Sequence, residues 1–255
     1  MPRSQLSRAT ALGCLLAILL AASALASGAL VKVNSIILRA DGSFQPRALP
    51  HRGFAPIDFH GYFDVAAKGG GKPVALQEAV IDFDRDGRLN AAGLPVCVPE
   101  QVANVGVREA RELCRGAIVG TGRIEALVDL GGASVPASSA LTFFNGPSRE
   151  GEPTVILHAR TNAPATQTFA ILVPIERRPG AFRYRASMSF PQIASGLGSI
   201  TRVEATLGRR FTVGGQTRSY LSAHCTDGIL HTHGRFTFAD GTVVDGSVEK
   251  ACSVR

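Results

Sequence analysis

Three histidines close to the C-terminal end of the chain have the residue type and spacing of a metal site. They are His224, His231 and His233, in the stretch SYLSAHCTDGILHTHGRFTF. Apolar residues alternate on both sides of Asp227-Gly228, a dipeptide that favours a two-residue hairpin turn. That turn would place His224 directly opposite His231, with His233 two residues along the same strand face. Three imidazoles can form an open Zn²⁺ or Cu²⁺ site; the alternative is a solvated strand face that carries histidines by chance.

Three aspartates at alternating positions suggest a second kind of ion site. Asp82, Asp84 and Asp86 precede a glycine, as at the start of an EF-hand calcium loop. Such a loop also needs a carboxylate at its twelfth position, which here is Gly93. As a strand, the same stretch would bury its apolar residues on one face, point Asp82 and Asp84 to the other, and end in a hairpin turn at Asp86-Gly87. The sequence therefore favours a strand, and calcium binding is the less favoured alternative.

Four of the five cysteines lie outside the apolar N-terminal segment that contains Cys14, which we expect to be removed as a signal peptide. Their even number predicts two disulfides in an exported chain. Short loops cost the least entropy to close, so we expect the pairs Cys97–Cys114 and Cys225–Cys252. The second pair conflicts with a simple meander, which would put its cysteines two strand spacings apart, or ~9.6 Å. We therefore expect the last strand to cross to another sheet or the C-terminal tail to curl back. No Cys-x-x-Cys spacing supports a metal site at these residues.

No local catalytic motif is present in the sequence. A nucleophilic serine in a Gly-x-Ser-x-Gly turn is missing, and the Gly-rich stretch 195–200 lacks the lysine of a phosphate-binding loop. The chain has no tryptophan and three tyrosines, which argues against a sugar-stacking surface. A hydrolase would have to assemble its catalytic residues from separate loops.

Alternation with a period of two residues dominates the chain and predicts many strands. The segments 169–175 and 182–190 each carry apolar residues on one face, and a turn at Arg177–Gly180 joins them into a hairpin. About a dozen such segments predict an all-β fold, an antiparallel β-sandwich or a barrel-like sheet. One short helix is expected at 107–114, with an apolar stripe that consists of Ala110, Leu113 and Cys114.

The N-terminus has the pattern of a secretory signal peptide. Arg3 and Arg8 precede the apolar run 11–22, and Ala24-Leu25-Ala26 supplies the small residues of a cleavage site. We expect residues 1–26 to be removed and residues 27–255 to form a single all-β domain outside the cell. No other segment is long and apolar enough to span a membrane. The formal net charge of +7 is scattered along the chain, which argues against nucleic acid as a partner.

Three stretches resemble uncharacterised secreted β-rich proteins of GC-rich bacteria: GLPVC at 93–97, ELCRGAIVGTG at 112–122 and CTDG…FTFADGT at 225–242. The resemblance implies an exported β-rich domain and brings no catalytic residues with it. Our leading hypothesis is a secreted, disulfide-bonded module that binds an extracellular or cell-surface ligand or plays a structural role, without a cofactor. A Zn²⁺ or Cu²⁺ protein using the histidine cluster and an extracellular hydrolase are the alternatives.

Overall fold

The computed structural model describes residues 28–162 and 165–255. The expected signal peptide lies outside the described residues. The main sheet consists of twelve strands: β1 (Ala29–Val33), β2 (Ile36–Gln45), β5 (Asp58–Ala67), β6 (Leu76–Asp84), β8 (Ile118–Leu130), β9 (Ala133–Asn145), β10 (Thr154–Thr161), β11 (Gln167–Arg177), β12 (Phe182–Ser189), β13 (Gly198–Leu207), β17 (Ile229–Phe238) and β18 (Val243–Ala251).

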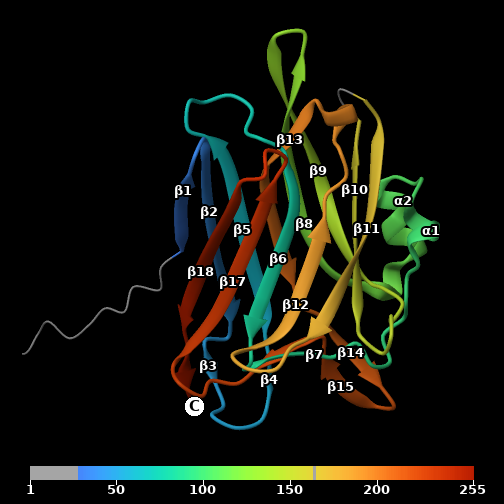
Figure 1. Cartoon of the computed structure of the whole chain (residues 1–255). Coiled ribbons are helices and arrows are strands. Elements are labelled where there is room, and N and C mark those ends of the chain that lie inside the picture. Colours follow the sequence, from blue (N-terminus) through green and yellow to red (C-terminus); the bar gives the residue numbers. More distant parts are fainter. Residues whose placement is uncertain (1–27, 163–164) are drawn as a thin grey trace, which may run out of the picture.

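The twelve strands form one antiparallel sheet that curves almost into a barrel (Figure 1). Their order is β1-β2-β5-β13-β8-β9-β10-β11-β12-β6-β17-β18. The two edge strands, β1 and β18, meet side by side, but no hydrogen-bonded ladder joins them. A β-carbon placed on Gly246 of β18 would lie 3.2 Å from that of Ala29 in β1. The fold is therefore all-β as expected, and it takes the barrel-like form.

Shorter strands gather at one end of the near-barrel sheet, the lower end in Figure 1. They form a three-stranded sheet β4-β16-β7, a hairpin of β14 with β15, and a parallel pair of β19 with β3. These strands are β3 (Ala48–Leu49), β4 (Ala55–Pro56), β7 (Gly87–Leu89), β14 (Arg210–Val213), β15 (Gln216–Ser219), β16 (Leu221–Ala223) and β19 (Ser253–Val254).

The main core lies inside the curved sheet, because each strand turns alternate residues inward. The hairpin expected from the alternation is confirmed as β11 and β12, which pair Ile175 with Ala186. Both of these residues are buried, and so is Tyr184. Phe236 and Phe238 of β17 point inward in the same way and are almost completely buried. The expected inward faces of these strands are thus confirmed.

Two short helices cover the outer face of the sheet, α1 (Pro99–Val102) and α2 (Val107–Leu113), and single 3₁₀ turns lie at 115–117 and 194–196. The expected helix is confirmed as α2, whose last residue is followed by Cys114 as the C-cap. Ala110 and Cys114 are buried against β9 and β10, in a small core with Phe144 and Ile156. Leu113 was expected in the same stripe, but it is 58% exposed, because its side chain points away from the sheet.

Both expected disulfides are confirmed. Cys97–Cys114 closes the segment that carries the two helices, with Cα atoms 5.5 Å apart. Cys225–Cys252 joins the end of β16 to the end of β18, with Cα atoms 6.1 Å apart. The expected crossing of the last long strand to another sheet is wrong, because β18 pairs with β17 in the main sheet. The conflict with a meander is avoided by β16 instead, which pairs with β4 and β7 outside the main sheet.

Candidate functional site

The inner face of the near-barrel sheet lines a partly open cavity of about 300 Å³, in the half of the interior that faces the short strands. The lining is almost entirely apolar and comes from inward-facing positions of most strands of the main sheet and from β7 and β16. Large side chains that contribute to it include Phe59, Phe63, Phe83, Phe143, Leu157 and Leu207. A volume of this size falls at the lower end of the range for small-molecule pockets, which are also mostly apolar.

Small inward-facing residues leave this space unfilled. Four alanines line it from different strands, namely Ala40, Ala186, Ala205 and Ala223. Glycines contribute less, because an aromatic ring covers each of two inward-facing ones. A β-carbon on Gly61 would lie 2.8 Å from the Phe59 ring, and one on Gly234 would lie 2.8 Å from the Phe236 ring. The cavity therefore depends on alanines at positions where the other lining strands carry large residues.

Among the tyrosines that line the cavity, Tyr184 and Tyr220 differ in the environment of their hydroxyl groups. The Tyr184 hydroxyl accepts a hydrogen bond from the backbone N–H of Leu89 at 3.4 Å. The Tyr220 hydroxyl is fully buried and has no hydrogen-bond partner among the described residues. Burial raises the pKa of Tyr220 above its ordinary value, so the group stays neutral. Tyr220 is thus an unsatisfied polar group in an otherwise apolar region.

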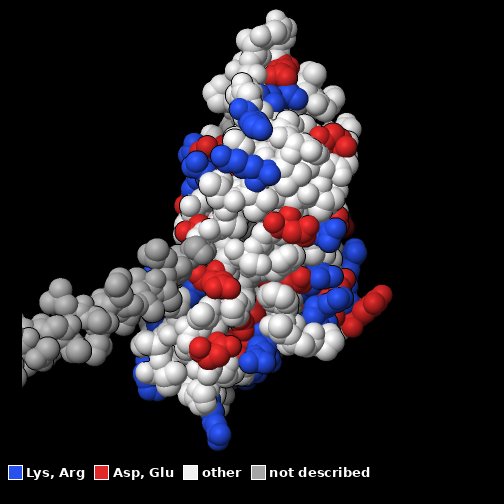
Figure 2. All heavy atoms as spheres, turned by 60° about the vertical axis from the view of Figure 1, so that its left-hand side comes forward, with Lys and Arg blue, Asp and Glu red and all other residues white. Residues whose placement is uncertain are grey.

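One ion pair lies at the seam where the two edges of the sheet meet. Lys250 of β18 lines the cavity, and its ammonium Nζ lies 2.6 Å from Oδ1 of Asp41 in β2. The register places Lys250 opposite Leu230, which also faces the interior. Figure 2 views the molecule from the side of β1 and β18, and cationic and anionic side chains alternate over this face. The pair joins two strands that no backbone hydrogen bond joins.

The acidic stretch is a strand, as expected, and its carboxylates accept hydrogen bonds from neighbouring strands and turns. Asp82 accepts two hydrogen bonds of 2.8 Å from the guanidinium of Arg185 on β12. Asp84 accepts backbone N–H bonds from Asp86 and His231, at 2.8 and 2.7 Å. Burial is the main cause that raises the pKa of Asp84, and these two hydrogen bonds oppose it.

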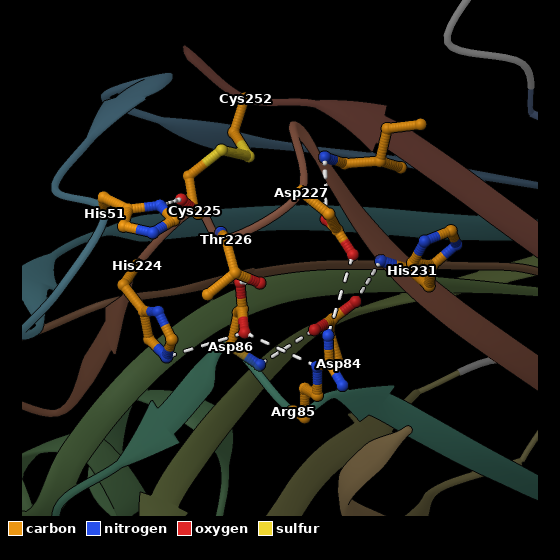
Figure 3. Close-up of a disulfide and its surroundings, with 11 residues drawn as sticks. His51, Asp84, Arg85, Asp86, His224, Cys225, Thr226, Asp227, His231 and Cys252 are labelled. Atoms are coloured by element: carbon orange, nitrogen blue, oxygen red, sulfur yellow. Dashed lines mark hydrogen bonds and ion pairs between the residues drawn. A yellow bond between two sulfur atoms is a disulfide. The ribbon is translucent and has the colours of Figure 1, made fainter. Parts of the chain in front are cut away.

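Asp86 holds the loop that follows β16, as Figure 3 shows. Its Oδ2 accepts hydrogen bonds from the backbone N–H and the hydroxyl of Thr226, at 2.8 and 2.7 Å. The expected hairpin at Asp86-Gly87 is wrong. The turn consists of Arg85 and Asp86, and the strand after it, β7, pairs with β16 instead of returning along β6. This change of direction carries the chain into the short sheet.

The three histidines do not form the expected cross-strand cluster. His231 and His233 lie on β17, opposite Glu249 and Ser247 of β18, whereas His224 follows β16 in another sheet. The expected hairpin about Asp227-Gly228 is therefore wrong, because β16 and β17 are not paired. Figure 3 shows the His224 and His231 side chains on different sides of the acidic turn.

Each histidine instead lies near a carboxylate. His224 Nε2 is 3.5 Å from Asp86, His231 Nδ1 is 3.5 Å from Glu249, and His233 Nε2 is 3.9 Å from Asp245. Over residues 28–162 and 165–255, no group of three or more His, Cys, Asp or Glu side chains is placed to hold a metal ion. Metal binding by these histidines, and calcium binding by the acidic stretch, remain predictions without a ligand set.

Sequence reasoning missed Lys250, Asp41 and Tyr220. A signal for Lys250 exists in VVDGSVEKA, where Val244, Gly246, Val248 and Lys250 alternate on the inward face. No local pattern signals Asp41 or Tyr220, because the contacts of both depend on strands far away in the sequence.

Comparison with known proteins gives no further guidance on this site. No protein-family model, curated protein or solved structure matches the chain. In the part of the chain that the structure describes, no helix is long and apolar enough to cross a membrane. The resemblance to secreted bacterial proteins stays a prediction.

Proposed function

We propose that this chain is an exported binding protein that holds a lipophilic small molecule inside its near-barrel sheet. The observation that carries this proposal is the apolar cavity of about 300 Å³ inside the sheet. Apolar pockets of this kind, with a few polar groups at defined places, are the usual form of small-molecule sites.

An unfilled cavity of this size would lower the stability of a protein that binds no ligand. Protein interiors normally pack as densely as organic crystals, and an apolar void destabilises the fold in proportion to its volume. A lipophilic ligand would restore the missing contacts and remove its own apolar surface from water. Binding thus explains why alanines such as Ala186 and Ala205 occupy positions where larger residues would fill the core.

Two features support export. The disulfides Cys97–Cys114 and Cys225–Cys252 are compatible with an extracellular protein, since such bonds persist in oxidising compartments. The N-terminal sequence has the charged, apolar and small-residue regions of a signal peptide. We propose cleavage after Ala26 and a ligand that the protein meets outside the cytoplasm. No arrangement among the described residues favours the metalloprotein or hydrolase alternatives over this one.

Titration with the neutral fluorophore N-phenyl-1-naphthylamine tests the proposal. We expect its emission to rise and shift to shorter wavelength on addition of the protein comprising residues 27–255. Ala186→Leu and Ala205→Leu should weaken binding by roughly tenfold, because each adds three carbons to the cavity.

Thr206→Leu is the matched control, because Thr206 lies next to Ala205 on β13 but is exposed on the outer face. It should leave the affinity unchanged. Absence of fluorophore binding by the wild type, or equal losses in all three variants, would refute an internal binding site.

A further inference from the structure

We infer that the cavity binds an anionic amphiphile, whose apolar tail occupies the interior and whose acidic headgroup pairs with Lys250 at the seam. The inference rests on the proposed function and adds to it a ligand class and a headgroup site. It follows from the construction of the seam, from the different burial of Lys250 and Asp41, and from the other charges that line the cavity.

The seam is covered by β1 over only part of its length. The ladder between β1 and β2 runs from Val33–Ile36 to Ala29–Ala40, so no ladder among the residues that the structure describes pairs this edge of β2 from Asp41 onward. Gly246 of β18 packs against β1, since a β-carbon there would lie 3.2 to 3.4 Å from side chains of that strand. Val248 and Lys250 follow on the same face of β18, beyond the start of β1. Within the described residues, β18 and β2 meet here through side chains without a backbone ladder, and we infer that this part of the seam is the route into the cavity.

Lys250 and Asp41 are unequal partners in their ion pair. The Lys250 side chain is 15% exposed and lines the apolar interior, whereas the Asp41 side chain is 33% exposed. Asp41 Oδ1 also accepts the N–H of Gly42 at 2.8 Å, so its carboxylate has a second interaction. The cation is therefore the more deeply buried member of the pair.

This difference favours an acid over a base as ligand. A carboxylate or phosphate headgroup that replaced Asp41 would keep Lys250 paired with an anion and release Asp41 toward water, where its charge is well solvated. A basic headgroup would take Asp41 from Lys250 and leave the more buried cation with less compensation. A neutral headgroup would leave the ion pair of Lys250 with Asp41 in place, and the pair would add nothing to its binding free energy.

Other charged groups that line the cavity are engaged elsewhere. Asp84 uses both carboxylate oxygens to accept backbone N–H groups. The guanidinium of Arg88, an exposed residue, lies 5.3 Å from the centre of the Phe54 ring. At the seam, Lys250 lines the cavity and already pairs with one carboxylate, that of Asp41, which the acidic headgroup of the ligand would replace.

Three twelve-carbon amphiphiles test the headgroup. Dodecanoic acid, dodecanol and dodecylamine have the same tail and differ in charge at pH 7.5, and each would be titrated, below its aggregation concentration, against bound N-phenyl-1-naphthylamine. We expect the wild type to bind the acid roughly tenfold more tightly than the alcohol, the value of one charge-assisted hydrogen bond. The amine should bind most weakly.

Two variants of the pair should shift acid binding in opposite directions. Lys250→Met should remove the preference for the acid and leave dodecanol affinity within about twofold. Asp41→Asn should tighten acid binding by about twofold to threefold, because the competing carboxylate is gone. Asp64→Asn is the matched control, since Asp64 pairs with Arg202 at the same distance of 2.6 Å but across strands joined by a ladder.

The outcomes separate this inference from the proposed function. If the wild type fails to bind the fluorophore, both are refuted. If it binds the fluorophore but the three amphiphiles compete equally, or if Lys250→Met weakens acid and alcohol alike, the headgroup site is refuted and the lipophilic cavity stands. If Asp64→Asn changed the affinity for dodecanoic acid as much as Asp41→Asn does, the headgroup site would also be refuted. The change would then reflect surface charge in general.

Discussion

At the scale of single residues, Tyr184 and Tyr220, which both line the cavity, form a natural comparison. Tyr220→Phe removes a buried hydroxyl that has no partner in the described residues, so it should stabilise the ligand-free protein by about 1 kcal/mol. Tyr184→Phe removes a hydroxyl that accepts the N–H of Leu89 and should destabilise the protein by about 1 kcal/mol. Urea unfolding monitored by circular dichroism measures both. Equal losses of stability would show that the Tyr220 hydroxyl is satisfied in solution.

Asp86 offers a second test at this scale. Its substitution distinguishes a carboxylate that stabilises the fold through hydrogen bonds from one that binds calcium. Asp86→Ala removes two hydrogen bonds to Thr226 and should lower the free energy of unfolding by about 2 to 3 kcal/mol. The loss should be the same with calcium and with chelator. Asp245→Ala, at a largely exposed carboxylate, is the control and should change stability little. A calcium-dependent rise in melting temperature that Asp86→Ala abolishes would restore the ion-site hypothesis.

At the scale of elements, the outer helices cover a buried histidine. His158 of β10 is completely buried beneath α1 and α2, next to Phe144, and neither ring nitrogen has a well-aligned hydrogen bond within the described residues. Burial lowers the pKa of His158, and Arg160 and Arg111 add to this effect, although the carbonyls of Val102 and Val105 oppose it. The helices therefore pack over a neutral imidazole.

The lowered pKa of His158 predicts a pH dependence of stability. The unfolded chain takes up the proton near pH 6.5, above the pKa of the folded state, so the contribution of His158 is complete above pH 6.5 and is lost as the pH falls below it. In His158→Leu, melting temperatures should fall less between pH 7.5 and pH 5 than in the wild type. The exposed His60, substituted by Gln, is the control. Identical pH profiles for wild type and His158→Leu would contradict this account.

The elements also show how far the sequence could predict the structure. Inward and outward faces were predicted correctly for β12 and β17, because alternation is a local property of each strand. Pairing partners were wrong wherever a turn looked like a hairpin but led into another sheet, as at Asp86-Gly87 and Asp227-Gly228. Those turns are decided by β7 and β16, which pair across more than a hundred residues of sequence. The cavity was beyond prediction for the same reason, since it depends on how all the strands close around one interior.

At the scale of the whole molecule, the sheet closes everywhere through backbone hydrogen bonds except at one seam. From β2 through β17 every neighbour in the main sheet is joined by a ladder, whereas β18 meets β1 and β2 through side chains. Edge strands have unpaired backbone groups on one side and are held less firmly than central ones. The seam is thus the place where this fold can open at the lowest free energy, and it borders the cavity.

Amide hydrogen exchange should show that the seam opens at a lower free energy than the centre of the sheet, and that a ligand changes this difference. In the ligand-free protein, we expect the amides of β18 and of residues 41–45 to exchange faster than those in the centre of β9 and β10, whose ladders are complete on both sides. Saturating dodecanoic acid should slow exchange in β18 and residues 41–45 by roughly tenfold or more, because a ligand that binds only the closed state suppresses opening. Exposed amides of the β8–β9 turn at Gly131–Gly132 are the control and should not change. Uniform exchange across the sheet, or protection confined to β9 and β10, would show that the molecule opens elsewhere and that the seam is not the entrance.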